Sequence, residues 1–152
     1  MTYRALNKIF KKMGVTSVPA NTTVQMACQI MAERNIAILF VTEHNTICGS
    51  FSERDLLMKV AAGKLDPTLT PLKSVMSPLT TTISPFDTTE KALGLMREHG
   101  IRHLPVEVNG DIIAVVSMQE LYESVRVELE DGIRHISSYV NGDIYSAATL
   151  MG

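Results

Sequence analysis

The stretch GSFSERD, at residues 49–55, is typical of the end of a β-strand followed by a tight turn and the start of a helix. A second stretch, AVVSMQE at residues 114–120, has the same pattern. In each, a serine is followed three residues later by an acid, Asp55 in the first and Glu120 in the second. This spacing is that of a capping box, in which serine and acid satisfy free amides at a helix start. One corner therefore occurs twice, which indicates an internal repeat.

The two corners belong to longer copies of one pattern. Residues 31–57 align with residues 96–122 without a gap, and 8 of the 27 aligned positions are identical. Most of the identities are apolar, so the two copies share the spacing of their core positions.

Each copy predicts a short strand, a helix, two strands joined by a turn, and a closing helix. The first copy has a strand at 16–18, a helix capped by Asn21 and ending near Arg34, strands at 36–41 and 47–51, and a helix from Ser52. The second copy has a strand at 81–83, a helix capped by Asp87 and ending near His99, strands at 101–106 and 112–116, and a helix from Ser117. Asn35 and Gly100 suit the helix ends, and Asn109-Gly110 suits a tight hairpin.

One such unit leaves an apolar sheet face uncovered, and a second copy can cover it. We therefore expect an α+β fold in which two β-α-β-β-α repeats pack sheet to sheet about a pseudo-twofold axis, with a long C-terminal helix. The expected divisions are an N-terminal docking helix at 1–14, a first repeat at 15–62, a linker at 63–78, a second repeat at 79–124, and a helical extension with a tail at 125–152.

The N-terminal segment carries four basic residues before the first acid, Glu33. Its apolar residues share one helical face: Leu6, Ile9, Phe10 and Met13. A membrane-surface or targeting helix and a short helix docked on the core both fit this pattern. We favour docking, because the stretch is short and no cleavage signal follows it.

Composition excludes several classes of protein. Hydrophobic residues make up 45% of the chain, which is enough for a folded core, and the net charge of −2 argues against a nucleic-acid binder. No apolar run approaches the roughly 20 residues of a membrane span. Cys28 and Cys48 form no CxxC pair, so we expect buried thiols and a cytoplasmic location.

Motifs for catalysis are missing from the sequence. His99 and His103 have the i, i+4 spacing of a metal-binding helix, but Gly100 and a strand pattern lie between them. Phosphate-loop, nucleophile-elbow and dinucleotide-binding motifs are absent. We therefore expect a protein that is not an enzyme and needs no cofactor or metal.

The repeated corner has a structural and a functional interpretation. In the structural interpretation, the corner caps a helix and has no other role. In the functional interpretation, it can also bind a nucleotide, because a helix N-terminus attracts phosphate and a neighbouring carboxylate can accept hydrogen bonds from a ribose diol. Cations for the phosphates are available at Arg54, Arg102 and His103.

The segments GIRHLPV at 100–106 and GSFSERD, within a tandem repeat of this length, resemble a pair of cystathionine-β-synthase (CBS) domains, also called a Bateman module. The resemblance runs from about Val15 to Tyr122. It implies a regulatory module that binds AMP, ADP or ATP, with S-adenosylmethionine or an NAD derivative as alternatives. The rival interpretation is a structural or partner-binding dimer with no nucleotide ligand, in which both corners are only caps.

The resemblance also implies site residues. Asp55 would hold the ribose hydroxyls, Ser52 would lie near phosphate, and the opposite repeat would supply phosphate and base contacts. The expected site comprises Ser52, Arg54, Asp55, Thr81, Thr82, Ile83, Arg102, His103 and Pro105. The second cleft joins Glu120 and Ser117 to Ala37 and Ile38 and lacks a cation, so we expect it to be empty or weak.

The closing helix is expected to continue from Ser117 to about Val140, with a short tail beyond it. Its apolar residues recur at spacings of three and four: Tyr122, Val125, Leu129, Ile133, Ile136 and Val140. The stripe is longer than one small repeat, so part of it packs either on another subunit or back on its own module. We favour a homodimer, which the resemblance also implies, and an unidentified protein target.

Overall fold

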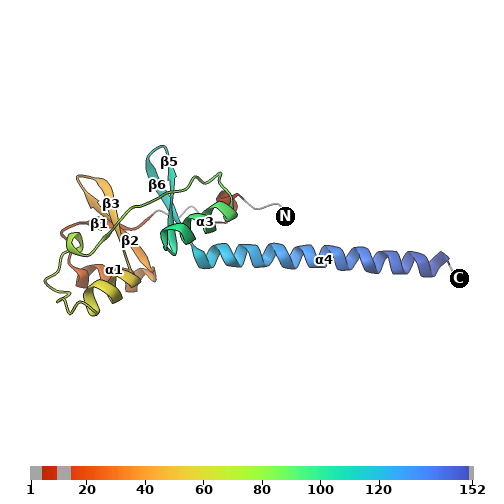
Figure 1. Cartoon of the computed structure of the whole chain (residues 1–152), viewed down its shortest axis with the longest axis horizontal. Coiled ribbons are helices and arrows are strands. Elements are labelled where there is room, and N and C mark those ends of the chain that lie inside the picture. The colour runs from red at the N-terminus through yellow and green to blue at the C-terminus, as the bar shows by residue number, and fades with distance from the viewer. Residues whose placement is uncertain (1–4, 10–14, 151–152) are drawn as a thin grey trace.

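The computed structural model describes residues 5–9 and 15–150, with side chains as far as residue 141. Figure 1 shows two small α/β units beside each other and one long helix that extends away from the second unit. The fold class is α+β with two repeats and a long C-terminal helix, as the sequence predicts.

The first repeat has a four-stranded sheet in the order β1-β2-β3-β4. Its strands are β1 (Ser17–Pro19), β2 (Ile38–Glu43), β3 (Thr46–Ser52) and β4 (Ser77–Pro78). β1 runs parallel to β2, and the other neighbours are antiparallel. Its helices are α1 (Val24–Arg34), the single turn α2 (Glu53–Asp55) and the π-helix η2 (Leu56–Ala61), while the linker adds the 3-10 turn η3 (Leu72–Ser74).

The second repeat is built on a smaller hairpin of β5 (His103–Val108) and β6 (Asp111–Ser117). Asn109 and Gly110 have positive φ angles of 52° and 86°, as a tight hairpin turn requires. α3 (Thr89–His99) precedes the hairpin and α4 (Met118–Leu150) follows it. The strand expected at 81–83 is only a single parallel bridge from Ile83 to Val106.

The two repeats match strand for strand. β2 and β5 have the same order of buried and exposed residues, and so do β3 and β6. The register shifts at equivalent places, after Val41 in the first hairpin and after Val106 in the second. Similar spacing of apolar residues has therefore produced similar backbones, with one irregularity conserved between the copies.

Each repeat encloses its own apolar core. The first includes Leu39, Val41 and Phe51, and the second includes Leu104, Val106 and Leu121. Phe40 belongs to neither core although it is only 1% exposed. Its side chain leaves the opposite face of β2, toward the second repeat.

The N-terminal segment docks on the second repeat. Within the described residues 5–9 of this segment there is a 3-10 turn, η1 (Leu6–Lys8), and Leu6 is fully buried in the second core. The Leu6 amide donates to the Asp87 carbonyl at 3.0 Å, and the Asn7 amide donates to the Pro85 carbonyl at 2.9 Å. Phe10 and Met13 lie outside the described residues.

The helix ends differ from the prediction in three places. Thr23 and Thr88, not Asn21 and Asp87, are the N-caps of α1 and α3, with hydroxyls that accept from the Met26 and Lys91 amides. Asn35 and Gly100 end these helices in the left-handed conformation, as expected. α4 continues to Leu150 rather than ending near Val140.

Candidate functional site

Asp55 is a buried carboxylate, 7% exposed, at the corner where β3 meets α2. Its Oδ2 accepts from the Ser52 amide at 3.0 Å and from the Ser52 hydroxyl at 3.1 Å. The Asp55 amide in turn donates to Ser52 Oγ at 3.3 Å, which completes the capping box. The residue therefore performs the structural role that the sequence allows.

The other oxygen of Asp55 is also occupied. Its Oδ1 accepts from the Ser77 hydroxyl at 2.7 Å and pairs with Lys59 Nζ at 2.9 Å. Lys59 also donates to the Val75 carbonyl at 3.0 Å and to Ser77 Oγ at 2.9 Å. The corner of the first repeat is thus tied through one carboxylate and one ammonium to the linker strand β4.

These two partners of Asp55 were not among the expected site residues. Lys59 follows Asp55 by four residues, a spacing at which oppositely charged side chains meet on a helix, so the sequence held a signal for it. Ser77 lies in a segment that composition marks only as a linker, so only the strand pairing of β4 with β3 places it here.

Apart from Arg54, which lies on α2, the remaining residues expected at this site lie along the start of β5 and the segment before α3. The Ile83 amide donates to the Pro105 carbonyl at 3.0 Å, so residues 81–83 run beside β5 as expected. Thr82 donates through its hydroxyl to Glu107 at 2.8 Å, and the Thr81 hydroxyl has only a 3.4 Å contact with the Thr82 carbonyl. Arg54 and Arg102 are both exposed.

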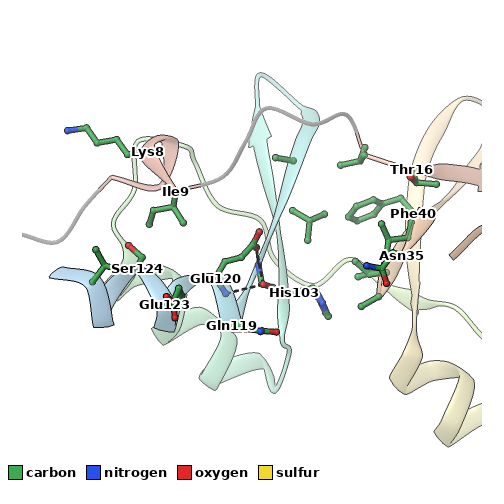
Figure 2. Close-up of a pocket in the computed structure, with 18 residues that line it drawn as sticks. Lys8, Ile9, Thr16, Asn35, Phe40, His103, Gln119, Glu120, Glu123 and Ser124 are labelled. Carbon is green, nitrogen blue, oxygen red and sulfur yellow. Dashed lines mark hydrogen bonds between the residues drawn. The ribbon is translucent and has the colours of Figure 1, made fainter. Parts of the chain in front are cut away.

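A large pocket lies in the other cleft, the one expected to be empty or weak. Its volume is about 910 Å³, within the range of small-molecule sites. Ile38 and Phe40 line it from the first repeat, and Val115 and Glu120 from the second. Figure 2 shows Phe40 extending from β2 toward the second repeat, with Glu120 and His103 on the far side.

Glu120 forms a capping box that mirrors that of Asp55. Its Oε2 accepts from the Ser117 amide at 2.7 Å and from the Ser117 hydroxyl at 2.9 Å. Unlike Asp55, Glu120 is exposed and borders the pocket. The large pocket therefore lies in the cleft that Glu120 borders, and the buried Asp55 does not line it.

His103 lines the pocket on the Glu120 side, although the sequence assigned it to the Asp55 cleft. Burial lowers the pKa of His103 from its ordinary value of 6.5, and the charge of Arg102 lowers it further. The carboxylates of Glu53 and Glu120 act in the opposite direction without offsetting the effect of burial. The imidazole is thus within electrostatic reach of α2 in one repeat and α4 in the other.

We expect His103 to make the fold less stable in mild acid. Because its pKa is lower in the folded chain than in the unfolded chain, unfolding takes up a proton below about pH 6.5. Stability from the neutral imidazole is therefore complete above that pH and is lost as the pH falls. In thermal melts between about pH 7 and pH 5, His103→Gln should lose less stability than the unmodified protein. The control is His135→Gln, on an exposed part of α4, which should not change how stability depends on pH. If His103→Gln also leaves this pH dependence unchanged, His103 is not the residue that causes it.

The described residues show no metal site or membrane span. Within residues 5–9 and 15–150, no group of three or more histidine, cysteine or acidic side chains is arranged to hold a metal ion. Among the helices that the structure describes, none combines the length and apolar character of a membrane-spanning segment.

The comparisons with known proteins agree with this architecture. Residues 9–62 and 72–126 each match the family model of the CBS domain. The chain therefore belongs to the CBS-domain family, and it carries the domain as a tandem pair.

Two curated relatives illustrate the similarity. CBS domain-containing protein CBSCBSPB1 of Arabidopsis thaliana is 32% identical over 111 residues, 72% of this chain but 20% of the relative. CBS domain-containing protein YhcV of Bacillus subtilis is 30% identical over 107 residues, 70% of this chain and 76% of the relative. The chain thus spans about a fifth of the Arabidopsis protein.

Solved structures of CBS-domain proteins share the fold. One from Burkholderia ambifaria is 30% identical with a TM-score of 0.73, covering 82% of this chain and 93% of the other. PAE2072 of Pyrobaculum aerophilum, solved in complex with AMP, is 24% identical with a TM-score of 0.68, covering 77% of this chain and 89% of the other.

Proposed function

We propose that this chain is a regulatory module that binds an adenosine nucleotide, AMP, ADP or ATP, between its two repeats. The observation that carries the proposal is the corner where β3 meets α2, which places the Ser52 hydroxyl and the Asp55 carboxylate at a helix start. The pocket of about 910 Å³ in the other cleft supports it more generally, because it leaves room for a small molecule between the repeats. AMP in the Pyrobaculum protein supports a nucleotide as the ligand class for this fold.

We further propose the Asp55 cleft as the stronger site. Asp55 and Ser52 would contact the ribose and the first phosphate, and Arg54 and Arg102 are exposed cations available for phosphate. The pocket on the Glu120 side is instead lined by two carboxylates, Glu120 and Glu123, against one lysine, Lys8, so its net negative charge disfavours phosphate. Residues 81–83 and Pro105 would complete the stronger site from the second repeat, and His103, which lines the other pocket, is within electrostatic reach of Glu53 on α2.

Binding at Asp55 requires a rearrangement. A carboxylate has about four lone-pair positions, and four donor contacts already occupy those of Asp55. A ribose hydroxyl must therefore displace the Ser77 hydroxyl or the Lys59 ammonium. Ser77 is part of the linker strand β4, and Lys59 is hydrogen-bonded to Ser77. Displacement of either group would therefore couple ligand binding to the segment that joins the repeats.

The same saturation of Asp55 favours a second candidate function. If the carboxylate serves only to hold the corner and the linker together, the chain is a structural or partner-binding dimer with no nucleotide ligand. Two further proposals are common to both functions: the protein works as a homodimer on an unidentified protein target, and it works in the cytoplasm. The second rests on its two unpaired cysteines, of which Cys28 has a pKa raised by burial.

The experiment is a thermal-shift panel of AMP, ADP, ATP, S-adenosylmethionine and NAD. At about 100 times its dissociation constant, a true ligand should stabilise the protein by about 2.7 kcal/mol. Asp55→Asn should lose most of this shift, because an amide cannot accept both ribose hydroxyls, and the matched change Glu120→Gln should retain it.

Each outcome decides between the candidates. Loss of the shift in Glu120→Gln alone would move the site to the large pocket and overturn the choice of Asp55. Equal loss in both variants would contradict a single strong site. No shift with any of the five compounds would favour the structural or partner-binding function.

A further inference from the structure

α4 is far longer than the module needs. Its 33 residues correspond to about 50 Å of helix, and Figure 1 shows it extending away from both repeats. Leu121, in its first turn, is fully buried in the second core. From Leu129 to Asn141 every described side chain is exposed.

The exposed part carries large apolar side chains of a kind that is normally buried away from water. They are Tyr122, Leu129, Ile133, Ile136, Tyr139 and Val140, each at least 45% exposed. An isolated helix is marginally stable in water, and most helices depend on packing an apolar face. No other described segment of this chain covers this face, so its partner must come from outside the chain.

The spacing of these residues indicates that the partner is another helix with the same spacing. Tyr122, Leu129 and Ile136 are separated by seven residues, as are Ile133 and Val140. In a heptad written abcdefg, the first three occupy position d and the last two occupy position a. Such a repeat keeps one seam facing a second helix of the same kind along its whole length.

The choice of residues favours two parallel strands. β-branched residues at a and leucine at d favour a two-stranded parallel coiled coil, and this chain has Ile133 and Val140 at a and Leu129 at d. Ile136 at the next d position weakens this preference. We propose that α4 pairs with α4 of a second copy as a parallel two-stranded coiled coil. This assignment rests on the proposed homodimer and specifies the surface that forms it.

Charges on the helix are compatible with this pairing. Arg126 occupies the one polar a position between Tyr122 and Val140, and it is bonded to Glu123 and, at 2.7 Å, to Glu130 on its own helix. Two arginines facing each other across the seam therefore bring their own counter-charges. A polar a residue of this kind aligns the two helices at a cost in stability.

The seam is short for a coiled coil. It runs from Tyr122 to Val140, just under three heptads, and five of its six a and d positions are apolar, whereas the next d position is Asp143. A stable interface buries about 800 Å² per partner, and the row of six large exposed side chains supplies much of that area.

The first test measures the mass of the full chain by sedimentation velocity over a dilution series. The unmodified protein should be a dimer, and Ile133→Asp should weaken self-association by about 100-fold or more, because it buries a charge in the seam. Ser138→Asp, on the opposite exposed face, is the matched control and should leave the dimer intact.

The second test locates the contact. In a Cys28→Ser, Cys48→Ser background, Ile133→Cys should form a disulfide between two copies, because a parallel pair places equal a positions opposite each other. Ser138→Cys should not. A dimer that persists in Ile133→Asp without the Ile133→Cys disulfide would overturn the proposal in favour of another surface, and a monomeric unmodified chain would overturn it in favour of a different partner.

The thermal-shift panel of nucleotides distinguishes failure of the coiled-coil proposal from failure of the proposed function. Ile133→Asp should retain the ligand-induced shift, since the substitution lies in a part of α4 that extends beyond both repeats. A chain that dimerises through α4 but binds no nucleotide would leave the coiled coil standing while the sensor proposal fails.

Discussion

Replacing Phe40 by alanine is expected to lower the free energy of unfolding by about 3–5 kcal/mol, the usual range for a fully buried aromatic ring. Phe40 is 1% exposed and lies outside both cores, on the side of β2 that faces the second repeat. Its loss should therefore weaken the contact between the repeats more than either core. Because the chain has no tryptophan, urea unfolding followed by circular dichroism is the suitable measurement.

The matched control for this prediction is Phe86→Ala. Phe86 is 77% exposed, so its truncation should change the stability by less than about 0.5 kcal/mol. We also expect Phe40→Ala to broaden the transition, as the two repeats unfold less cooperatively. Similar costs for the two phenylalanines would show that the ring between the repeats contributes little.

Replacing Asp55 by alanine is expected to lower the free energy of unfolding by about 2–3 kcal/mol, because the carboxylate loses its half of the capping box and its bonds to Ser77 and Lys59. The value stays below that of a fully buried ion pair because the Lys59 side chain is 40% exposed and keeps its hydration. The measurement is urea unfolding without ligand.

Glu120→Ala provides the comparison within the same molecule. Glu120 forms the same capping box, but it is exposed and makes no hydrogen bond to the described linker residues, so its loss should lower the free energy of unfolding by about 0.5–1 kcal/mol. Equal costs at the two corners would mean that the contacts of Asp55 with the linker add nothing to stability.

The fold was predictable from the sequence because it depends on patterns that repeat. Apolar spacing in residues 31–57 and 96–122 led to matching hairpins, and the capping boxes at Asp55 and Glu120 formed as expected. The N-caps were placed two residues and one residue too early. In Asn21-Thr22-Thr23 each side chain can cap a helix, and only the backbone shows that the helix begins after Thr23.

The far end of α4 illustrates a similar difficulty. Asn141 and Gly142 are typical of a helix end, yet the helix continues through them to Leu150. A glycine inside a helix costs only about 1 kcal/mol relative to alanine, so it weakens a helix without stopping it.

The candidate site was only partly accessible to sequence analysis. Motifs identify side chains such as Asp55 and Arg102, but they do not say which of their bonds are already satisfied. They also do not give free volume, which depends on how the two sheets pack around Phe40. For that reason the large pocket on the Glu120 side came from the structure alone. The assignment of the nucleotide to the Asp55 cleft stays a prediction.

The insertion of Leu6 into the second core makes the two halves topologically interdependent. Leu6 and Asn7 lie on the second repeat, the residues that follow form the first repeat, and the chain then forms the rest of the second repeat around Leu6. A fragment that starts after the linker would lack the side chain that fills this position, and it would also lose two backbone hydrogen bonds. The repeats therefore share one pattern but differ in whether each could fold alone. The first is formed by consecutive residues, whereas the second also needs Leu6 from the N-terminal segment.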